Sequence, residues 1–284
     1  MQRITDVYAA ARRAGVDRLD AQLLLTHRLG RSRAWLLAHD DAPLAPDDTA
    51  WLGTALARRA AGEPLAYVIG EWAFRGRLFA VGPAVLVPRP ETEVLVEWAL
   101  QLLAGPLAGP GAPAVVDLGT GSGAIAVSVA AERTGQARSG HVVATDASGP
   151  ALRVAAANAR RHDIEIEFLQ GDWWQPLAGR VFDLALSNPP YIAGDDAHLA
   201  ALGREPRGAL TPEGDGLGAL RRIIDDAPRH LAPGGWLLLE HGHDQGAAVR
   251  ALMQAQGFLE IATRADLAGL ERCSGGRRAG RAPA

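Results

Sequence analysis

Short apolar runs alternate with segments of helical periodicity from about residue 91 onward, and this alternation constrains the fold more than any other feature of the chain. One helical segment places Leu152, Ala155, Ala156 and Ala159 at i, i+3, i+4 and i+7, which marks a single face. Strands that alternate with helices predict an α/β domain with a doubly wound, mostly parallel sheet over residues 91–275. The predicted strands are 115–118, 141–145, 166–169, 182–187 and 236–239.

A small all-α domain is predicted for residues 1–70, because they carry helical periodicity and almost no strand pattern. Asp47 is the predicted cap of a helix whose apolar positions follow at i, i+3 and i+4. Those positions are Leu52, Ala55 and Leu56. We assign four further residues to the core of this domain, rather than to a binding stripe: Trp35, Leu36, Leu37 and Trp51.

The remaining segments are connectors and a tail. Residues 71–90 are predicted to join the two domains through a short β-hairpin with Gly76 at its bend. The Gly/Pro-rich stretch 105–113 is predicted to be a loop before the first strand of the sheet. Residues 276–284 are predicted to be a disordered tail.

Composition narrows the class of protein. The chain has 284 residues, of which 48% are hydrophobic, and a formal net charge of −3. It contains no run of about 18 apolar residues and its start lacks a signal-peptide core, so we expect a cytoplasmic protein that does not enter a membrane. The single cysteine, Cys273, permits no internal disulfide and fits a reducing compartment.

The basic residues exclude several chemistries. All 29 are arginine, and the absence of lysine excludes Schiff-base catalysis, pyridoxal-phosphate attachment and a P-loop. The mildly negative charge and the lack of a dense basic block argue against tight, sequence-independent DNA binding, although a local arginine patch remains open.

The segment 117–123, Asp-Leu-Gly-Thr-Gly-Ser-Gly, follows a predicted strand and opens a helix. Its glycines allow a tight turn and let a ligand approach the helix N-terminus closely. Gly119, Gly121 and Ala124 also satisfy the looser dinucleotide pattern G-x-G-x-x-G/A, so the loop alone predicts a small-molecule cradle without naming the cofactor.

Two further strand ends carry acidic residues. Asp146 ends the second predicted strand, where its carboxylate can accept hydrogen bonds from both ribose hydroxyls of an adenosine-containing cofactor or can cap the following helix. Asp172 and Trp173 end the third strand and offer a carboxylate and an indole where an adenine ring could lie. All these residues meet at the carboxyl edge of the sheet, where such sheets bind ligands.

The tetrapeptide Asn188-Pro189-Pro190-Tyr191 ends the fourth predicted strand and suits the chemistry of a planar NH2 group. An amide nitrogen is a poor nucleophile because its lone pair is delocalised, so a catalyst must fix both N–H bonds. The side-chain oxygen of Asn188 and the backbone carbonyl of Pro189 can accept them, and Tyr191 can lie against the planar group. The pattern indicates methylation of an amide or amine nitrogen, although Asn-Pro is also a common loop signal.

These residues together resemble the class I S-adenosylmethionine-dependent methyltransferases, with a Rossmann-like fold, and specifically the protein-glutamine N5-methyltransferases that modify peptide chain release factors. The resemblance covers nearly the whole chain. It is sharpened by Val-Pro-Arg-Pro-Glu-Thr-Glu at 87–93 and by Glu-Pro-Arg at 205–207. The Asn-Pro-Pro-Tyr motif is shared with enzymes that methylate adenine or cytosine amino groups in nucleic acids. The segment 87–93 is similar to that of the release-factor enzymes, whereas a sister group that acts on a ribosomal-protein glutamine tends to carry a different sequence after the Pro-Arg. Methylation of a ribosomal-protein glutamine and of adenine N6 in nucleic acid remain the alternatives.

The resemblance implies an enzyme that transfers a methyl group to the glutamine of the Gly-Gly-Gln loop of bacterial class-1 release factors and leaves S-adenosyl-L-homocysteine. It implies that the helical domain grips the protein substrate, and we expect a monomer that needs neither nucleic acid nor metal. The implied catalytic residues are Asn188, Pro189 and Tyr191. The implied cofactor residues are Gly119, Thr120, Gly121, Ser122, Gly123, Asp146, Trp173 and Asn188, and the implied substrate residues are Asn188, Pro189, Pro190 and Tyr191. No catalytic base is assigned.

Other candidate residues stay open. His241 and His243 could begin a metal site, but no third ligand is evident, and a loop role is favoured. Glu240 could line the edge of the pocket or make structural hydrogen bonds. Arg75, Arg77 and Arg89 could meet an acidic partner or a cofactor carboxylate, or could be ordinary exposed arginines. A non-catalytic cofactor-binding adaptor is a further alternative.

Overall fold

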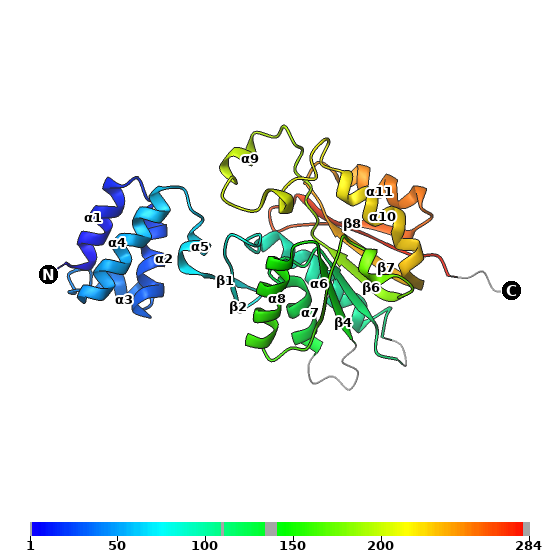
Figure 1. The fold of residues 1–284 in the computed structure, drawn as a ribbon, viewed down its shortest axis with the longest axis horizontal. Helices are drawn as coiled ribbons and strands as arrows, with labels where there is room; N and C mark the ends of the chain where they lie inside the picture. The colour runs from blue at the N-terminus through cyan, green and yellow to red at the C-terminus, as the bar shows by residue number, and fades with distance from the viewer. Residues whose placement is uncertain (1, 109–110, 134–140, 281–284) are drawn as a thin grey trace. The chain divides into compact units, whose positions relative to one another are not determined.

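The computed structural model describes residues 2–108, 111–133 and 141–280. The chain forms two compact units, Met1–Trp72 and Ala73–Ala284. Figure 1 shows a helical N-terminal unit and a larger unit built on a central sheet. In the described ranges, no helix is both long enough and apolar enough to cross a membrane.

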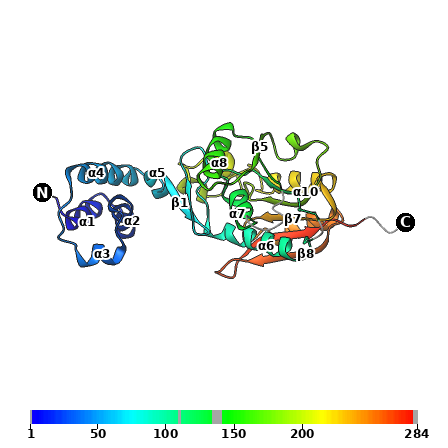
Figure 2. The ribbon, with the colours of Figure 1, turned by 90° about the horizontal axis from the view of Figure 1, so that it is seen from below.

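The N-terminal unit is helical, as predicted. Its helices are α1 (Ile4–Arg13), α2 (Arg18–Leu29), α3 (Arg33–Ala38), α4 (Pro46–Ala60) and α5 (Leu65–Ile69). Figure 2 shows α1 to α4 gathered into one bundle, and their buried side chains form one core. The Asp17 side chain caps α2 by accepting a hydrogen bond from the Leu19 N–H at 2.7 Å, and Gly30, with φ 61°, ends the helix.

The predicted core positions Leu52, Ala55 and Leu56 on α4 are buried, as is Leu36. The prediction for Leu37 is wrong, since this side chain is 58% exposed. In the short helix α3, Leu36 takes the inward position, and the next residue lies about 100° further round the helix. Two tryptophans assigned to the core, Trp35 and Trp51, are partly buried against it.

The helix α4 also begins earlier than predicted. Ala45 is its N-cap residue and Pro46 occupies the first helical position, so Asp47 lies within the first turn rather than at the cap. Proline is well suited to this position because its missing N–H would have no partner there. Asp47 and Asp48 then place negative charge at the positive end of the helix dipole.

The predicted hairpin is present as β1 (Glu71–Phe74) and β2 (Arg77–Ala80). Arg75 and Gly76 form its bend with φ values of 46° and 71°. Phe74 and Phe79 are buried in the core of the larger unit. A single 3-10 turn, Pro90–Thr92, follows and leads into the next helix.

The larger unit contains a seven-stranded sheet in the order β5-β4-β3-β6-β7-β9-β8. The strands are β3 (Val115–Leu118), β4 (Val142–Asp146), β5 (Glu167–Gln170), β6 (Phe182–Ser187), β7 (Leu231–Glu240), β8 (Leu259–Ala265) and β9 (Glu271–Arg277). The helices are α6 (Glu93–Ala104), α7 (Ala124–Arg133), α8 (Gly149–Arg161), α9 (His198–Ala201), α10 (Gly218–His230) and α11 (Gly246–Ala255), with 3-10 turns at Gln175–Leu177 and Arg207–Ala209. Of the predicted loop 105–113, the described residues form neither helix nor strand.

The five predicted strands are confirmed as parallel neighbours. Two antiparallel strands at one edge, β8 and β9, were missed. Their sequences obscure them, because β9 contains glycine at 275 and 276 and β8 is largely exposed. A Cβ on Gly275 would lie 2.3 Å from a methyl carbon of Leu238, so close packing demands glycine in this strand.

The predicted tail starts too early. Residues 276 and 277 belong to β9, with Gly276 paired to Leu237 and Arg277 paired to Trp236. Residues 278–280 follow without regular structure. Residues 281–284 lie outside the described part of the chain.

Alternate side chains of the sheet enter two separate cores. In β6, Leu184 and Leu186 face the core covered by α6, α7 and α8, while Ala185 faces the core covered by α10 and α11. Figure 1 shows these helices flanking the sheet. Because both faces are covered, the central parallel strands β3, β4, β6 and β7 carry mostly apolar residues, which is why their runs were recognisable in the sequence.

Strand order reverses between β3 and β6. From β3 the chain proceeds to β4 and β5 on one side, and β6 and β7 lie on the other. Parallel sheets of this kind leave a crevice outside the carboxyl ends of the strands at such a point. The glycine loop after β3, Asp146 at the end of β4 and Asn188 after β6 therefore converge there.

Candidate active site

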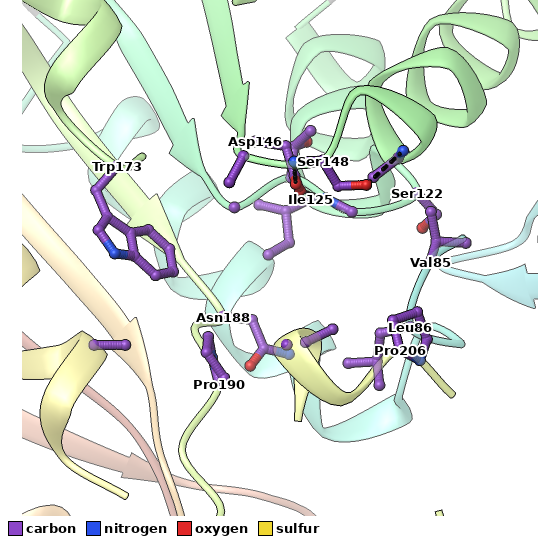
Figure 3. Close-up of a pocket in the computed structure, with 18 of the residues that line it drawn as sticks. Val85, Leu86, Ser122, Ile125, Asp146, Ser148, Trp173, Asn188, Pro190 and Pro206 are labelled. Atoms are coloured by element: carbon purple, nitrogen blue, oxygen red, sulfur yellow. Dashed lines mark hydrogen bonds between the residues drawn. The ribbon is translucent and has the colours of Figure 1, made fainter. Parts of the chain in front are cut away.

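A cavity of about 510 Å³ opens at the carboxyl edge of β3, β4 and β6. Figure 3 shows Asp146 and Trp173 on different sides of it, with Asn188 and Pro190 at its base and Leu86 and Pro206 facing them. The cavity is lined by eight of the site residues that were predicted from the sequence, namely Gly119, Thr120, Gly121, Ser122, Asp146, Trp173, Asn188 and Pro190. The volume lies within the range of ordinary small-molecule sites.

The glycines of the loop have different roles. Gly119 has φ 73°, and a Cβ there would lie 2.9 Å from the Trp173 ring, so the indole packs directly on the loop backbone. Gly121, with φ 55°, is open, and a Cβ on it would meet nothing within 4 Å. Gly123 does not line the cavity; it packs against Ala155 on α8, where a Cβ would lie 3.2 Å from the Ala155 backbone. Gly123 therefore allows α7 and α8 to approach.

Asp146 holds this loop in place. One carboxylate oxygen, Oδ2, accepts a hydrogen bond from the Gly121 N–H at 2.9 Å, and the other, Oδ1, accepts one from the Ser148 N–H at 2.8 Å. Burial raises the pKa of Asp146, while these two hydrogen bonds lower it. The cap of α8 is Ser148, whose hydroxyl accepts from the Ala151 N–H, so Asp146 is not the helix cap. Each Asp146 oxygen retains a lone pair for a ligand.

A second carboxyl, Asp117, is fully buried beneath the loop. Its Oδ2 accepts hydrogen bonds from the Thr120 hydroxyl at 2.6 Å and from the Ala126 N–H at 3.2 Å, and Oδ1 has no partner among the described residues. Burial raises the pKa of Asp117 to about 7, against the two hydrogen bonds. A cation bound nearby would favour the ionised form of this carboxyl.

Asn188 enters the cavity from the end of β6. Its side-chain Nδ2 donates a hydrogen bond to Thr92 Oγ1 at 3.1 Å, and nothing in the described ranges donates to its Oδ1. Behind this pair lies Glu240 at the end of β7, which is 1% exposed. The Tyr191 hydroxyl donates to Glu240 Oε1 at 3.3 Å.

The environment of Glu240 is unusual for an acid. Burial raises its pKa to about 7, while hydrogen bonds from the hydroxyls of Thr92 and Tyr191 lower it. Its Oε2 is buried and accepts no well-aligned hydrogen bond from the described residues. The same burial, with the nearby Glu240 charge, raises the pKa of Tyr191. Glu240 is therefore a hydrogen-bond acceptor behind the cavity rather than a residue that lines it.

Two segments distant in sequence are tied together at one wall of the cavity. Glu205 is buried and accepts a hydrogen bond from the Val87 N–H at 3.0 Å, and it also pairs with the Arg89 guanidinium. Leu86 and Pro206, which flank these contacts, both line the cavity. The ion pair thus holds one wall of the site closed.

Comparison with known proteins identifies the family. The model of the PrmC N-terminal domain matches residues 7–70, and that of the methyltransferase small domain matches residues 96–265. The release factor glutamine methyltransferase of Bordetella pertussis is 53% identical over 266 residues, which cover 92% of this chain and 95% of that protein. That of Burkholderia pseudomallei is 50% identical over 278 residues, with 95% of each covered. This chain belongs to the release factor glutamine methyltransferases.

A solved structure supports the fold. A 16S rRNA methyltransferase from T. thermophilus, in complex with AdoMet and guanosine, superimposes with a TM-score of 0.53 at 20% identity. The match covers 73% of this chain and 49% of that one. The predicted class, a Rossmann-like methyltransferase fold with a helical N-terminal region, is confirmed.

Not every predicted site residue of this release factor glutamine methyltransferase reaches the cavity. Gly123, Pro189 and Tyr191 do not line it. The Tyr191 ring packs against the core on the α10 and α11 side, and its carbonyl accepts a hydrogen bond from Gln245 Nε2 at 2.9 Å. Their predicted roles in binding or catalysis remain predictions.

Sequence reasoning also missed some lining residues of this family member. Val85 and Leu86 come from the loop after β2, Ser148 from the cap of α8, and Pro206 from the loop after α9. The sequence contained a pattern that could have identified Ser148 and Pro206. Ser148 stands two residues after Asp146 in a helix-starting position, and Pro206 lies within the Glu-Pro-Arg segment noted above.

The open arginine candidates and His241 have structural partners. Arg75 and Arg77 pair with Glu132, and Arg89 pairs with Glu205. His241 is buried, with Nδ1 hydrogen-bonded to the Gly242 carbonyl at 2.8 Å and Nε2 to Ser274 Oγ at 2.7 Å. In the described part of the chain, no group of three or more His, Cys, Asp or Glu residues could hold a metal ion.

Proposed function

We propose that this chain transfers a methyl group from S-adenosyl-L-methionine to the side-chain amide nitrogen, N5, of a glutamine in a peptide chain release factor. The observation that carries the proposal is the position of Asn188, which brings an unpaired amide oxygen into the same cavity as the glycine loop and Asp146. Membership of the release factor glutamine methyltransferases supports the choice of substrate.

The residues present fit this cofactor. The space over Gly121 is open, and Asp146 offers an acceptor on each oxygen for the two ribose hydroxyls. Trp173 presents its indole to the cavity, beside which an adenine could stack. The buried Asp117 carboxyl, whose pKa burial raises to about 7, lies beneath the loop, and a cationic ligand there would favour its ionised form. When bound, the cofactor supplies an electrophilic methyl group on a sulfonium.

The chain would act on the substrate chiefly by positioning it. In this proposal the Asn188 Oδ1 and the Pro189 carbonyl each accept one N–H of the glutamine amide, and the nitrogen lone pair is thereby aimed at the methyl group. Fixed orientation of this kind can contribute about 7–11 kcal/mol to lowering a barrier. The amide nitrogen would gain the methyl group together with the positive charge and would then lose one N–H proton. Because the charge is spread out in the transition state, the apolar walls at Val85, Leu86 and Pro206 also favour the transfer.

The N-terminal unit would recognise the folded release factor. It has its own hydrophobic core, and the described residues that line the cavity begin at Ala84, so this unit contributes no residue to the cavity. It also leaves Leu37 exposed. A domain that does not shape the reaction site and yet belongs to the family's architecture is suited to gripping the substrate elsewhere.

A labelling experiment tests the function. The enzyme and methyl-labelled S-adenosylmethionine would be incubated with a release factor, with its glutamine-to-alanine loop variant, and with duplex DNA, and the methyl group would be located by peptide mass spectrometry. We expect label on the loop glutamine, none on the loop variant, and a loss of at least about a hundredfold in rate with Asn188→Ala, because that variant no longer orients the amide.

Other outcomes would redirect the proposal. Label on DNA alone would favour an adenine methyltransferase, and label on a ribosomal-protein glutamine in a parallel incubation would favour the sister activity. If Asn188→Ala methylates the release-factor glutamine at the wild-type rate, Asn188 does not hold the substrate amide during the reaction.

A further inference from the structure

Asn158 is a polar residue of α8 that is fully buried and does not line the cavity. Its side chain makes three hydrogen bonds to the backbone. Oδ1 accepts from the Ala80 N–H at 2.7 Å, and Nδ2 donates to the Ala80 carbonyl at 3.0 Å and to the Ser122 carbonyl at 2.8 Å. Because the oxygen and both N–H bonds of the amide are in use, this side chain is paired at every polar atom.

The backbone partners fix the orientation of the Asn158 amide. A backbone N–H can only donate and a carbonyl can only accept, so Oδ1 must face the Ala80 N–H and Nδ2 must face the two carbonyls. An amide rotated by 180° would oppose N–H to N–H and oxygen to oxygen. Since none of these groups is a titratable side chain, the direction of each hydrogen bond does not depend on pH.

These hydrogen bonds join two segments that border the cavity. Ser122 belongs to the glycine loop and lines the cavity. Ala80 ends β2, and the chain continues from it to Val85 and Leu86, which also line the cavity. Figure 3 shows Ser122 and Val85 on the same side of the cavity. Because one side chain binds both segments, Asn158 sets the position of the glycine loop relative to β2 and the wall that follows it.

The close packing of α8 on the glycine loop makes this contact possible. Ala155, which precedes Asn158 by one helical turn, packs against Gly123, where a Cβ would lie 3.2 Å from the Ala155 backbone. The absence of a side chain at Gly123 thus lets α8 come close enough for Asn158 to reach the loop. The Gly121 N–H is held from the end of β4 by Asp146 at 2.9 Å. The loop is therefore fastened at two points by two different side chains.

We propose that Asn158 is a positioning residue for cofactor binding, which holds the glycine loop against β2 in the conformation that receives S-adenosyl-L-methionine. It acts through the Ser122 carbonyl and does not itself line the cavity. A loop that is already fixed loses little conformational freedom when a ligand binds, so ordering offsets less of the interaction energy. The inference rests on the proposed function, because it names S-adenosyl-L-methionine as the ligand of the loop.

Asn158→Ala tests the inference through the separation of KM from kcat. Without the amide, the loop must be ordered when the cofactor binds. We expect the Kd for S-adenosylhomocysteine, measured by calorimetry, and the KM for S-adenosylmethionine to rise about tenfold. At saturating S-adenosylmethionine and release factor, kcat should stay within about twofold, because the bound cofactor then holds the loop. A purely structural loss would instead lower kcat at an unchanged KM, because fewer molecules would be folded.

His162→Phe is the matched control. His162 also ties β2 to the end of α8, since its Nε2 is hydrogen-bonded to the Leu78 carbonyl at 2.9 Å and its ring lies 5.3 Å from that of Phe79. Phenylalanine keeps a ring there but loses the hydrogen bond, and the glycine loop is not touched. This variant should lower Tm and keep both the Kd and the KM. The comparison separates anchoring of the hairpin from positioning of the cofactor loop.

Asn158→Asp is a second variant, which keeps the volume of the side chain in case the alanine variant does not fold. Its carboxyl can still accept from the Ala80 N–H, but it can donate one hydrogen bond when protonated and none when ionised. The ratio of its Kd for S-adenosylhomocysteine to that of the wild type should therefore rise with pH. A wild-type Kd at every pH would contradict the inference.

Three further results would overturn the inference. A wild-type Kd in folded Asn158→Ala would show that the loop needs no such anchor. A fall in kcat at the wild-type KM would make Asn158 a structural residue, and an equal rise in Kd in His162→Phe would assign the effect to the hairpin.

Calorimetry of the wild-type enzyme separates this inference from the proposed function. Binding of S-adenosylhomocysteine without methylation of the glutamine would overturn the assigned substrate, while the Kd comparison would still decide the role of Asn158. Absence of S-adenosylhomocysteine binding would overturn both.

Discussion

The Gly121 N–H donates a hydrogen bond to Asp146 Oδ2 at 2.9 Å, so the carboxylate that ends β4 fastens the loop that follows β3. In Asp146→Asn, one oxygen becomes an NH2 group that can accept neither from Gly121 nor from a ribose hydroxyl. We expect the Kd for S-adenosylhomocysteine to rise about ten- to hundredfold, as measured by calorimetry. Asp20→Asn, which removes a carboxylate paired with Arg59 in the N-terminal unit, is the control and should bind normally. Equal affinities in the two variants would contradict the assigned role.

Gly119→Ala tests the contact between the loop and Trp173. The backbone φ of 73° disfavours alanine by about 1–2 kcal/mol. In addition, the new Cβ would lie 2.9 Å from the indole, which must move. We expect a lower Tm together with weaker S-adenosylhomocysteine binding. Gly76→Ala has a similar φ of 71° and open space around its Cβ, so it should lower Tm without affecting binding. A wild-type Kd in Gly119→Ala would show that the indole does not shape the cofactor site.

Because its pKa is raised in the folded state, Asp117 should make the stability of the ligand-free protein depend on pH. Burial raises its folded-state pKa from 3.8 to about 7, so between these values the folded state binds more protons than the unfolded state. Its contribution to stability is complete below the unfolded pKa and is lost as the pH rises through about 7. Asp117→Asn is neutral throughout.

Urea unfolding of both proteins at a series of pH values would check this. Relative to Asp117→Asn, the free energy of unfolding of the wild type should fall by on the order of a few kcal/mol as the pH rises from about 4 to above 7. Each unit of difference between the folded and unfolded pKa contributes about 1.4 kcal/mol. If the difference in free energy of unfolding between the two proteins does not change with pH, Asp117 has the same pKa in the folded and unfolded states.

Leu37→Ser tests whether the N-terminal unit grips the protein substrate. Leu37 is 58% exposed, so the substitution removes apolar surface without opening the core. If this surface contacts the release factor, KM for the full-length factor should rise several-fold, since burying a leucine is worth about 1.5–3 kcal/mol at most. KM for a short peptide that contains the glutamine loop should not change. Leu267→Ser, a fully exposed leucine in the larger unit, is the control. An unchanged KM for both substrates would leave Leu37 outside the contact.

Elements that repeat a local pattern could be predicted from the amino-acid sequence. The central parallel strands are mostly apolar because both faces of the sheet are covered there. The glycine loop, Asp146 and Asn188 stand at strand ends that the parallel topology brings to one edge. Such signals lie within a few neighbouring residues and need no knowledge of distant partners. The methylation chemistry followed from them.

Features that depend on residues far apart in the sequence became visible only in the folded chain. β8 and β9 have weak strand patterns and exist because they pair at the edge of the sheet, where Gly275 packs on Leu238. The hydrogen bond from Asn188 to Thr92 joins residues 96 positions apart in the sequence, and no local pattern predicts it. Hydrogen bonding between side chains requires matched positions in space, and only the packed fold supplies them.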